Sequence, residues 1–199
     1  PFYFSVDFED YYHDKRRDMG INTPVFKIES LWKSYEKINY LCNKYLNSKK
    51  ITFFTTGIVA KEAKDLINKI YKDGHEIACH YNYHDSIHKS SKSEFSYNLD
   101  KAIEYIFNAT GVKPKGFRAP NFDIKPDDKW AYEEIAKRFE YDSSYITNLP
   151  LTKICPTSKM KFKNSVLKEF FIFSCSFLTK SFRLRWGGTF LKLFPVNLT

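Results

Sequence analysis

The segment His75-Glu76-Ile77-Ala78-Cys79-His80-Tyr81-Asn82-Tyr83-His84 joins a short apolar stretch to two histidines four residues apart. Residues 75–79 predict a buried strand, and His80 stands at its end. His84 follows after roughly one turn of backbone, so both imidazoles can reach a single ion. A His-x-x-x-His pair occurs often by chance, so the rest of the chain must supply the remaining ligand.

An acidic cluster lies about seventy residues upstream, in Val6-Asp7-Phe8-Glu9-Asp10. Residues 1–7 alternate loosely between apolar and polar side chains and predict a strand whose carboxyl end carries these acids. One carboxylate with two histidines makes a catalytic metal site that keeps an open position. Strand alternation favours Glu9 as the ligand, whereas a turn at the strand end would bring in Asp10. We take Asp10 as the first choice and keep Glu9 as the alternative.

Strand and helix patterns alternate along most of the chain. A loose stretch to Lys27, broken by Gly20 and Pro24, follows the first strand. Further strands are predicted at 51–55, 116–119 and 141–145. Helices are predicted at 31–45 and 63–70, from a cap at Ser93 to Gly111, and from Pro126 through Phe139. Beyond Pro150 the pattern weakens, with short strands at 161–162 and 170–174 and a last element from Gly187. Such alternation predicts a mainly parallel sheet with helices outside, and functional groups then gather at the carboxyl ends of the strands.

Arg118 also falls at a predicted strand end, so three polar clusters share one edge of the sheet. A bound divalent metal lowers the pKa of its water from about 16 toward 7. A nearby carboxylate that is not itself a ligand can then take the proton of that water. Asp7 is our candidate for this base, and Arg118 could orient it through a bidentate contact. His13, His75 and His88 lack such neighbours; we expect His13 and His88 on the surface.

Composition limits the alternatives. The 199 residues carry a net charge of +9 and 18% aromatic residues. The lysines are scattered and no nucleic-acid motif is present, so we expect no nucleic-acid partner, and a basic domain that binds an anionic polymer is the weakest alternative.

The four cysteines form no CxxC pair, and no apolar run is long enough to span a bilayer. The chain begins with Pro1 and ends just after an apolar stretch, so we expect a fragment at both ends. Compartment and oligomeric state stay open.

Together, four segments resemble one family: Ser5-Val6-Asp7-Phe8-Glu9-Asp10-Tyr11-Tyr12-His13, Arg118-Ala119-Pro120-Asn121-Phe122, Tyr141-Asp142-Ser143-Ser144 and Trp186-Gly187-Gly188-Thr189-Phe190. With the two histidines, they are similar to the polysaccharide deacetylases, the NodB-homology domains or family 4 carbohydrate esterases. Within that family they look most like the exopolysaccharide-locus branch. The resemblance spans most of the chain, so we expect residues 1–199 to form a single domain, truncated at its C-terminus.

The resemblance implies an α/β fold, a distorted (β/α) barrel that would be incomplete in this fragment. It implies a divalent metal, commonly zinc, held by an acid and two histidines, and removal of N-acetyl groups from a bacterial polysaccharide or oligosaccharide. By residue match, Asp7 corresponds to the base, His80 and His84 to the metal ligands, and Arg118 to the arginine that contacts the base. The backbone N–H near Asn121 would help to hold the developing oxyanion. Among the aromatic residues that could stack on sugar rings are Tyr11, Tyr83 and Trp186, although packing explains each of them as readily.

Several positions depart from the family pattern. Tyr81 stands where many members have Ser or Thr after the first histidine, and Asn121 replaces a usual tyrosine. No histidine follows His88, so the family's late histidine, the expected general acid, has no counterpart in these residues. Either the sequence stops before the segment that carries it, or the protein lacks this acid. A catalytically inactive relative that binds glycan without hydrolysing it is therefore the main alternative to an active deacetylase.

Overall fold

A computed structural model describes residues 4–22, 24–125, 127–147, 157–162, 165–176 and 183–185. Its main sheet has seven strands in the order β1-β2-β3-β4-β5-β8-β7. Their bounds are β1 Ser5–Phe8, β2 Thr52–Thr55, β3 Glu76–Cys79, β4 Gly116–Phe117, β5 Tyr141–Asp142, β8 Ser165–Phe170 and β7 Thr157–Phe162. All neighbouring strands are parallel except β7 and β8. A smaller sheet pairs β6 (Ile146–Thr147), β9 (Ile172–Ser176) and β10 (Arg183–Arg185).

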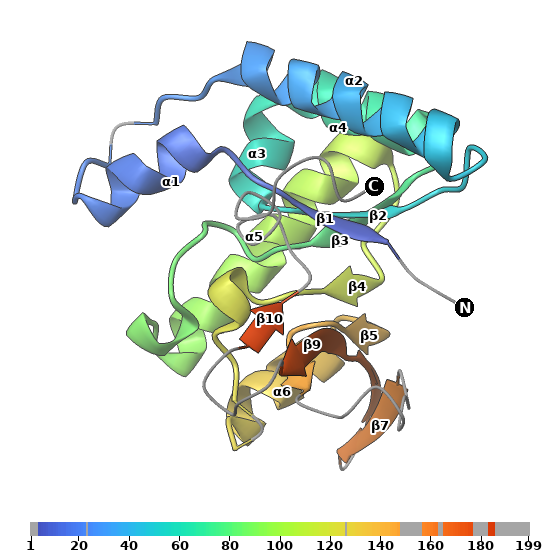
Figure 1. Cartoon of the computed structure of the whole chain (residues 1–199). Helices are drawn as coiled ribbons and strands as arrows, with labels where there is room; N and C mark the ends of the chain where they lie inside the picture. The colour runs from blue at the N-terminus through green and yellow to red at the C-terminus, as the bar shows by residue number, and fades with distance from the viewer. Residues whose placement is uncertain are drawn as a thin grey trace.

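Figure 1 shows β1, β2 and β3 side by side beneath α2, with β4 and β5 continuing the sheet. The helices are α1 Tyr11–Asp18, α2 Ile28–Tyr45, α3 Gly57–Glu62, α4 Lys64–Lys72, α5 Lys92–Thr110 and α6 Lys129–Ala136, with 3₁₀ turns η1 Ile87–Lys89 and η2 Pro120–Phe122. The strand–helix alternation and the parallel sheet predicted from the sequence are confirmed. Among the described residues, no helix combines the length and apolar character needed to cross a bilayer.

The core forms where the apolar stripes of the helices meet the sheet. Phe53 of β2 is fully buried and packs edge-on against Tyr35 of α2, with ring centroids 6.0 Å apart. His75 lies beside the same ring at 5.2 Å, and its Nδ1 accepts a hydrogen bond from the backbone N–H of Ile51. His75 is therefore a packing residue of the core, away from the polar edge of the sheet.

The strand register brings the polar clusters to one edge. Phe8, Thr55, Cys79, Phe117 and Asp142 are aligned in one row across β1 to β5. The residues that follow these strand ends therefore emerge side by side. This alignment sets Glu9, His80 and Arg118 at one edge of a parallel sheet, as the sequence predicted.

Helix α1 was not expected. It forms within the stretch predicted to be loose because Asp10 caps its N-terminus, accepting hydrogen bonds from the N–H groups of Tyr12 and His13. The helix lacks an apolar stripe; His13 is instead buried and stacked on Phe26 at 4.3 Å. The expectation that His13 lies on the surface is therefore wrong.

Several element boundaries also differ from the predictions. Helix α5 is capped by Ser91 rather than Ser93, because Ser91 and Glu94 form a reciprocal capping box. Strand β4 ends at Phe117, and α6 runs only from Lys129 to Ala136. Gly111 ends α5 in the left-handed conformation, as predicted. The last predicted element, from Gly187, lies outside the described residues.

Candidate metal centre

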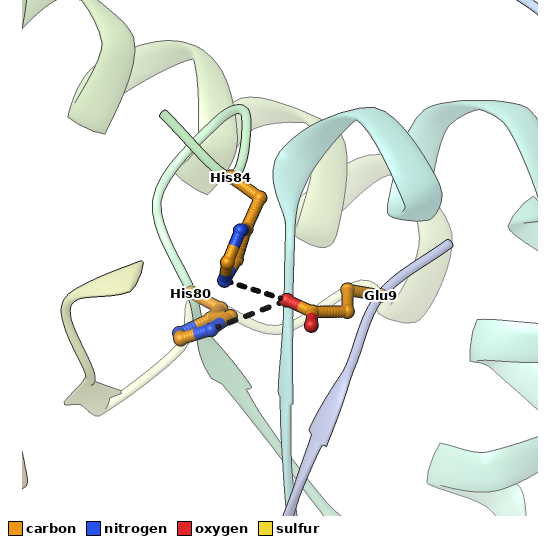
Figure 2. Close-up of side chains that lie close together, drawn as sticks. All are labelled: Glu9, His80 and His84. Carbon is orange, nitrogen blue, oxygen red and sulfur yellow. Dashed lines mark ion pairs between the residues drawn. The ribbon is translucent and has the colours of Figure 1, made fainter. Parts of the chain in front are cut away.

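Glu9, His80 and His84 converge at the carboxyl edge of the sheet (Figure 2). Glu9 Oε2 lies 3.0 Å from His84 Nε2 and 3.6 Å from His80 Nε2. One donor atom from each of the three residues lies within 4.8 Å of the others. Among the described residues, this is the one group of three or more His, Cys, Asp or Glu side chains with such spacing.

The first choice for the acidic ligand, Asp10, is not the acid that the structure places beside the histidines. Both Asp10 oxygens are already engaged, because Oδ1 caps α1 and Oδ2 accepts a hydrogen bond of 2.6 Å from the backbone N–H of Lys27. Glu9, the first residue after β1, instead places its Oε2 next to Nε2 of both histidines. The alternation argument for Glu9 therefore agrees with the geometry, and the argument for a turn does not.

The ring of His80 is oriented by the main chain. Its Nδ1 lies 2.8 Å from the carbonyl oxygen of Arg118. A carbonyl can only accept, so Nδ1 carries the hydrogen and the lone pair of the neutral ring is at Nε2, which faces Glu9. Such a hydrogen bond behind the donor atom is typical of histidines that bind metals.

The surroundings of the cluster favour a cation. Burial disfavours the charged form of Glu9, but hydrogen bonding and charge from the two histidines, when they are protonated in the absence of a metal, outweigh it and lower the pKa of Glu9 to about 2. Oxygen Oε2 of Glu9 is buried and has no hydrogen-bond partner of suitable geometry among the described residues. Two ring nitrogens and one carboxylate oxygen thus surround a position that a divalent metal would satisfy, so the residues fit such an ion.

The loop that carries the histidines is packed tightly against α3 and α5. Tyr81 adopts a left-handed backbone, with φ of 65°, and its carbonyl accepts a 2.8 Å hydrogen bond from the N–H of Gly57. A Cβ on Gly57 would lie 2.6 Å from Asn82 Oδ1 and 2.7 Å from Ala102 Cα. This close approach requires glycine, and it fixes where the loop leaves β3.

Arg118 follows β4 and reaches Asp7 of β1 across the sheet. Its Nη1 donates to Asp7 Oδ1 at 2.7 Å, and its Nη2 donates to the hydroxyls of Ser5 and Ser143, both at 2.9 Å. The contact with Asp7 is therefore single, not bidentate as expected, because the other nitrogens are used elsewhere; Nε donates to the carbonyl of Ser143. The guanidinium also lies 3.9 Å from the ring centroid of Phe54. Asp7 is held in place and remains partly exposed to solvent.

The serines after β5 were not identified as site residues from the sequence. Ser143 contributes two of the contacts to Arg118, and the Ser144 hydroxyl accepts a 2.8 Å hydrogen bond from the N–H of Ala119. Their only sequence signal was their place in Tyr141-Asp142-Ser143-Ser144. Since Ser143 lies 25 residues from Arg118, no local pattern could reveal this contact.

The remaining predicted site residues differ in their exposure and in their contacts. Tyr11 is 70% exposed at the start of α1, two residues after Glu9. One face of Tyr83 is covered, because the guanidinium of Arg17 lies 4.0 Å from its ring centroid. Asn121 lies in the exposed turn after Pro120, with φ of 54°. Trp186 lies outside the described residues.

Arg17 is a second contact that the sequence did not reveal. Besides covering Tyr83, it pairs with Asp85 through two hydrogen bonds, Nε to Oδ1 at 3.2 Å and Nη2 to Oδ2 at 2.5 Å. This pair ties the last turn of α1 to the residue after His84. The unexpected helix therefore braces the loop that carries the second histidine.

Fold and site together define an α/β protein whose functional groups gather at the carboxyl edge of a parallel sheet. The family model for polysaccharide deacetylases matches residues 35–142, more than half of the chain. The chain therefore belongs to the polysaccharide deacetylase family. Its α/β fold is of the deacetylase barrel type, as the resemblance implied.

Individual relatives match over shorter stretches. An uncharacterized protein of Bacillus subtilis, YlxY, is 42% identical over 72 residues, which cover 36% of this chain and 23% of the relative. The peptidoglycan-N-acetylglucosamine deacetylase of Bacillus cereus is 30% identical over 86 residues, which cover 43% of this chain and 31% of the relative. The chain thus spans about a quarter to a third of the length of these curated relatives. In structure, it is similar to a Mycobacterium smegmatis protein assigned as a polysaccharide deacetylase, with a TM-score of 0.65 and 19% identity over 84% of this chain and 58% of that one.

Proposed function

We propose that this protein is a metal-dependent N-deacetylase that acts on a bacterial polysaccharide or oligosaccharide. The observation that carries the proposal is the meeting of Glu9, His80 and His84 beside an aspartate held by Arg118. Membership of the deacetylase family supports the same activity. We further propose that residues 1–199 belong to one deacetylase domain, of the exopolysaccharide-locus branch that the four quoted segments resemble.

Each residue has a separate task in this proposal. Glu9, His80 and His84 would hold the ion, with zinc the first candidate because one acid and two imidazoles suit it. A divalent ion bound there would supply Lewis-acid polarisation of the acetamide carbonyl and would lower the pKa of a water molecule. Asp7 takes the proton from the attacking water, and Arg118 keeps its carboxylate in place.

The substrate would be recognised around this centre. The backbone N–H of Asn121 would donate to the oxyanion that develops on the acetamide oxygen. Tyr11 offers an exposed ring on which a sugar could stack, with Tyr83 and Trp186 as further candidates. The name of the Bacillus cereus relative specifies N-acetylglucosamine in peptidoglycan. We propose an N-acetylated glycan as the class of substrate here, without choosing the polymer.

The direct test combines metal content with acetate release. Wild-type protein, His80→Ala and His88→Ala would be loaded with zinc and incubated with N-acetylated oligosaccharides. His88 is the matched control because it contacts Asp123 and Asp128 and lies outside the metal cluster. We expect zinc binding and acetate release by wild type and His88→Ala, and neither by His80→Ala. Acetate release by His80→Ala at the wild-type rate would exclude this mechanism.

A second candidate function is glycan binding without hydrolysis. It is favoured by two departures from the family pattern, Tyr81 after the first histidine and Asn121 in place of the usual tyrosine. In that case the protein would bind zinc and N-acetylated oligosaccharides but release no acetate. Comparison of binding with acetate release in the same samples separates the two functions.

A further inference from the structure

Two buried carboxyl groups lie near the turn formed by Arg118 and Ala119, which follows β4. Asp142 ends β5, and Glu169 is its partner in the register on β8. Their exposures are 0% and 1%. Two carboxylates cannot both stay charged so close together in an interior of low dielectric, because each disfavours ionisation of the other. Neither residue has a task in the function proposed above.

The hydrogen bonds show which of the two is ionised. Asp142 Oδ2 accepts from the backbone N–H of Ser144, and Oδ1 accepts from the Ser144 hydroxyl, both at 2.8 Å. That hydroxyl already accepts from the N–H of Ala119 at 2.8 Å, so its own hydrogen is free to point to Asp142. Both Asp142 oxygens are therefore acceptors, as in an ionised carboxylate.

Glu169 has room for the proton. Its Oε1 accepts from the N–H of Tyr145 at 3.0 Å, whereas Oε2 is buried with no hydrogen-bond partner among the described residues. Burial, followed by the charge of Asp142, raises the pKa of Glu169 to about 10. Burial also raises the pKa of Asp142, but hydrogen bonding to Glu169, then the Ser144 hydrogen bonds and the charge of Arg118, oppose that rise. Tyr132 of α6 and Tyr145 are further titratable groups near the pair, and burial raises the pKa of Tyr132.

The pair is linked to the candidate site through two serines. Ser144, fixed by Asp142, holds the N–H of Ala119, and Ser143 holds the guanidinium of Arg118 through its carbonyl and hydroxyl. We propose that Asp142 and Glu169 share one proton, carried by Glu169, and that they act as positioning residues for the turn that orients Asp7. The role in activity rests on the proposed deacetylase function, whereas the shared proton does not.

Two isosteric variants test the assignment of the proton. Glu169→Gln keeps an oxygen for Tyr145 and places an NH₂ group where the proton lies. Asp142→Asn replaces one of two required acceptors with a donor facing Ser144. We expect acetate release within about threefold of wild type for Glu169→Gln and about 10–100-fold slower for Asp142→Asn, the usual cost of losing an orienting hydrogen bond. The opposite order, or equal losses, would overturn the assignment.

Stability against pH gives a test that does not depend on activity. The folded pKa of Glu169 lies above its unfolded value, so wild-type protein takes up a proton on folding and loses stability as pH rises through this range. The unfolding midpoint of Glu169→Gln should therefore rise relative to wild type between about pH 5 and 9. Infrared spectra should show a protonated carboxyl band in wild type that Glu169→Gln lacks. A constant midpoint difference, or no such band, would disprove the shared proton even in a protein that releases no acetate.

Ser144→Ala separates positioning from the proton. It keeps both carboxyl groups but removes the hydroxyl that joins Asp142 to Ala119. We expect acetate release to fall about tenfold while zinc affinity stays at the wild-type value. Wild-type acetate release by Ser144→Ala would show that the pair has no positioning role.

Discussion

Two parts of the same sheet edge are built in contrasting ways. At β1 and β3, the donor atoms of Glu9, His80 and His84 lie within 4.8 Å of one another, and a buried oxygen of Glu9 has no hydrogen-bond partner of suitable geometry among the described residues. At β4 and β5, the Arg118 guanidinium is matched by hydrogen bonds to side chains and main chain. In our proposal a divalent cation would complete the first part, whereas the hydrogen bonds of the second part are already made. In the proposed function, the first part would bind the metal ion, and the second part would hold Asp7 in position.

Loss of a donor atom in the first part should have the largest effect. His84→Ala leaves two donor atoms, so acetate release should fall by more than the roughly 100-fold that loss of an outer hydrogen bond to a ligand costs. Zinc at 100 times its Kd should stabilise wild type by about 2.7 kcal/mol, and His84→Ala by much less at the same concentration. Thermal unfolding with and without zinc measures this. Equal stabilisation of both proteins would show that zinc binds elsewhere.

Removal of the guanidinium should damage the second part without removing the ion. Arg118→Met leaves Asp7 and the serines without their donor. We expect a loss of about 1–3 kcal/mol in the free energy of unfolding, because the buried acceptors of Ser143 lose their hydrogen bonds while Asp7 stays partly exposed to solvent. Acetate release should fall sharply while zinc binding persists, because the main-chain carbonyl that orients His80 is unchanged. Urea denaturation and zinc titration provide the two readouts, with Arg138→Met as a control for loss of an arginine that follows α6 and lies away from the site. Loss of zinc binding in folded Arg118→Met would contradict the separation of the two parts.

Gly57→Ala tests how strictly the histidine loop is placed. The added methyl group would meet Asn82 and the backbone of Ala102, so the free energy of unfolding should fall by about 1–3 kcal/mol, the usual cost of overpacking. The zinc Kd should rise, because the loop shifts relative to Glu9. Gly111→Ala is a useful comparison, since no atom lies near its added Cβ and only backbone strain is introduced. An unchanged zinc Kd would indicate that the loop tolerates displacement.

The smallest expected effect concerns Glu134 of α6, away from both parts. Burial opposes its charge, but hydrogen bonds from Lys137 and Arg138 lower the pKa of Glu134 to about 2. Its contribution to stability is present above the unfolded pKa near 4.5 and is lost as pH falls toward 2. Glu134→Gln should therefore lower the free energy of unfolding by about 1 kcal/mol at neutral pH, since solvent screens the exposed Lys137. The free energies of unfolding of wild type and Glu134→Gln should converge as pH falls to about 2. A difference that stays constant with pH would refute the linkage.

Much of this fold follows from periodicity alone. The strands at 51–55 and 75–79 and the helix from 31 to 45 were predictable because their apolar residues face one core. Helix α1 was not, because its buried residues are His13 and Asp14 and its stabilisation comes from a cap and from Arg17. Its signals were an aspartate cap, three basic residues in the last turn and Gly20 soon after, all weaker than an apolar stripe.

The sequence allowed us to predict which residues form the candidate site, but not the hydrogen bonds that hold them. Parallel strands bring their carboxyl ends together, so Glu9, His80 and Arg118 could be expected at one edge. The choice between Glu9 and Asp10 depended on whether the chain stayed extended for one more residue. The contacts of Arg118 with Ser5 and Ser143 link residues 113 and 25 positions apart, and only the three-dimensional arrangement reveals them.

Arg118 contacts two residues of the candidate site through different groups. Its guanidinium donates to Asp7, and its main-chain carbonyl accepts a hydrogen bond from His80. Its side chain can be altered by mutation, whereas its carbonyl is supplied by any amino acid at this position. A homologue could therefore lose hydrolysis through mutation of Arg118 and still keep the imidazole of His80, just after β3, correctly oriented. Retained ion binding in a homologue would thus be poor evidence that the homologue still turns over substrate.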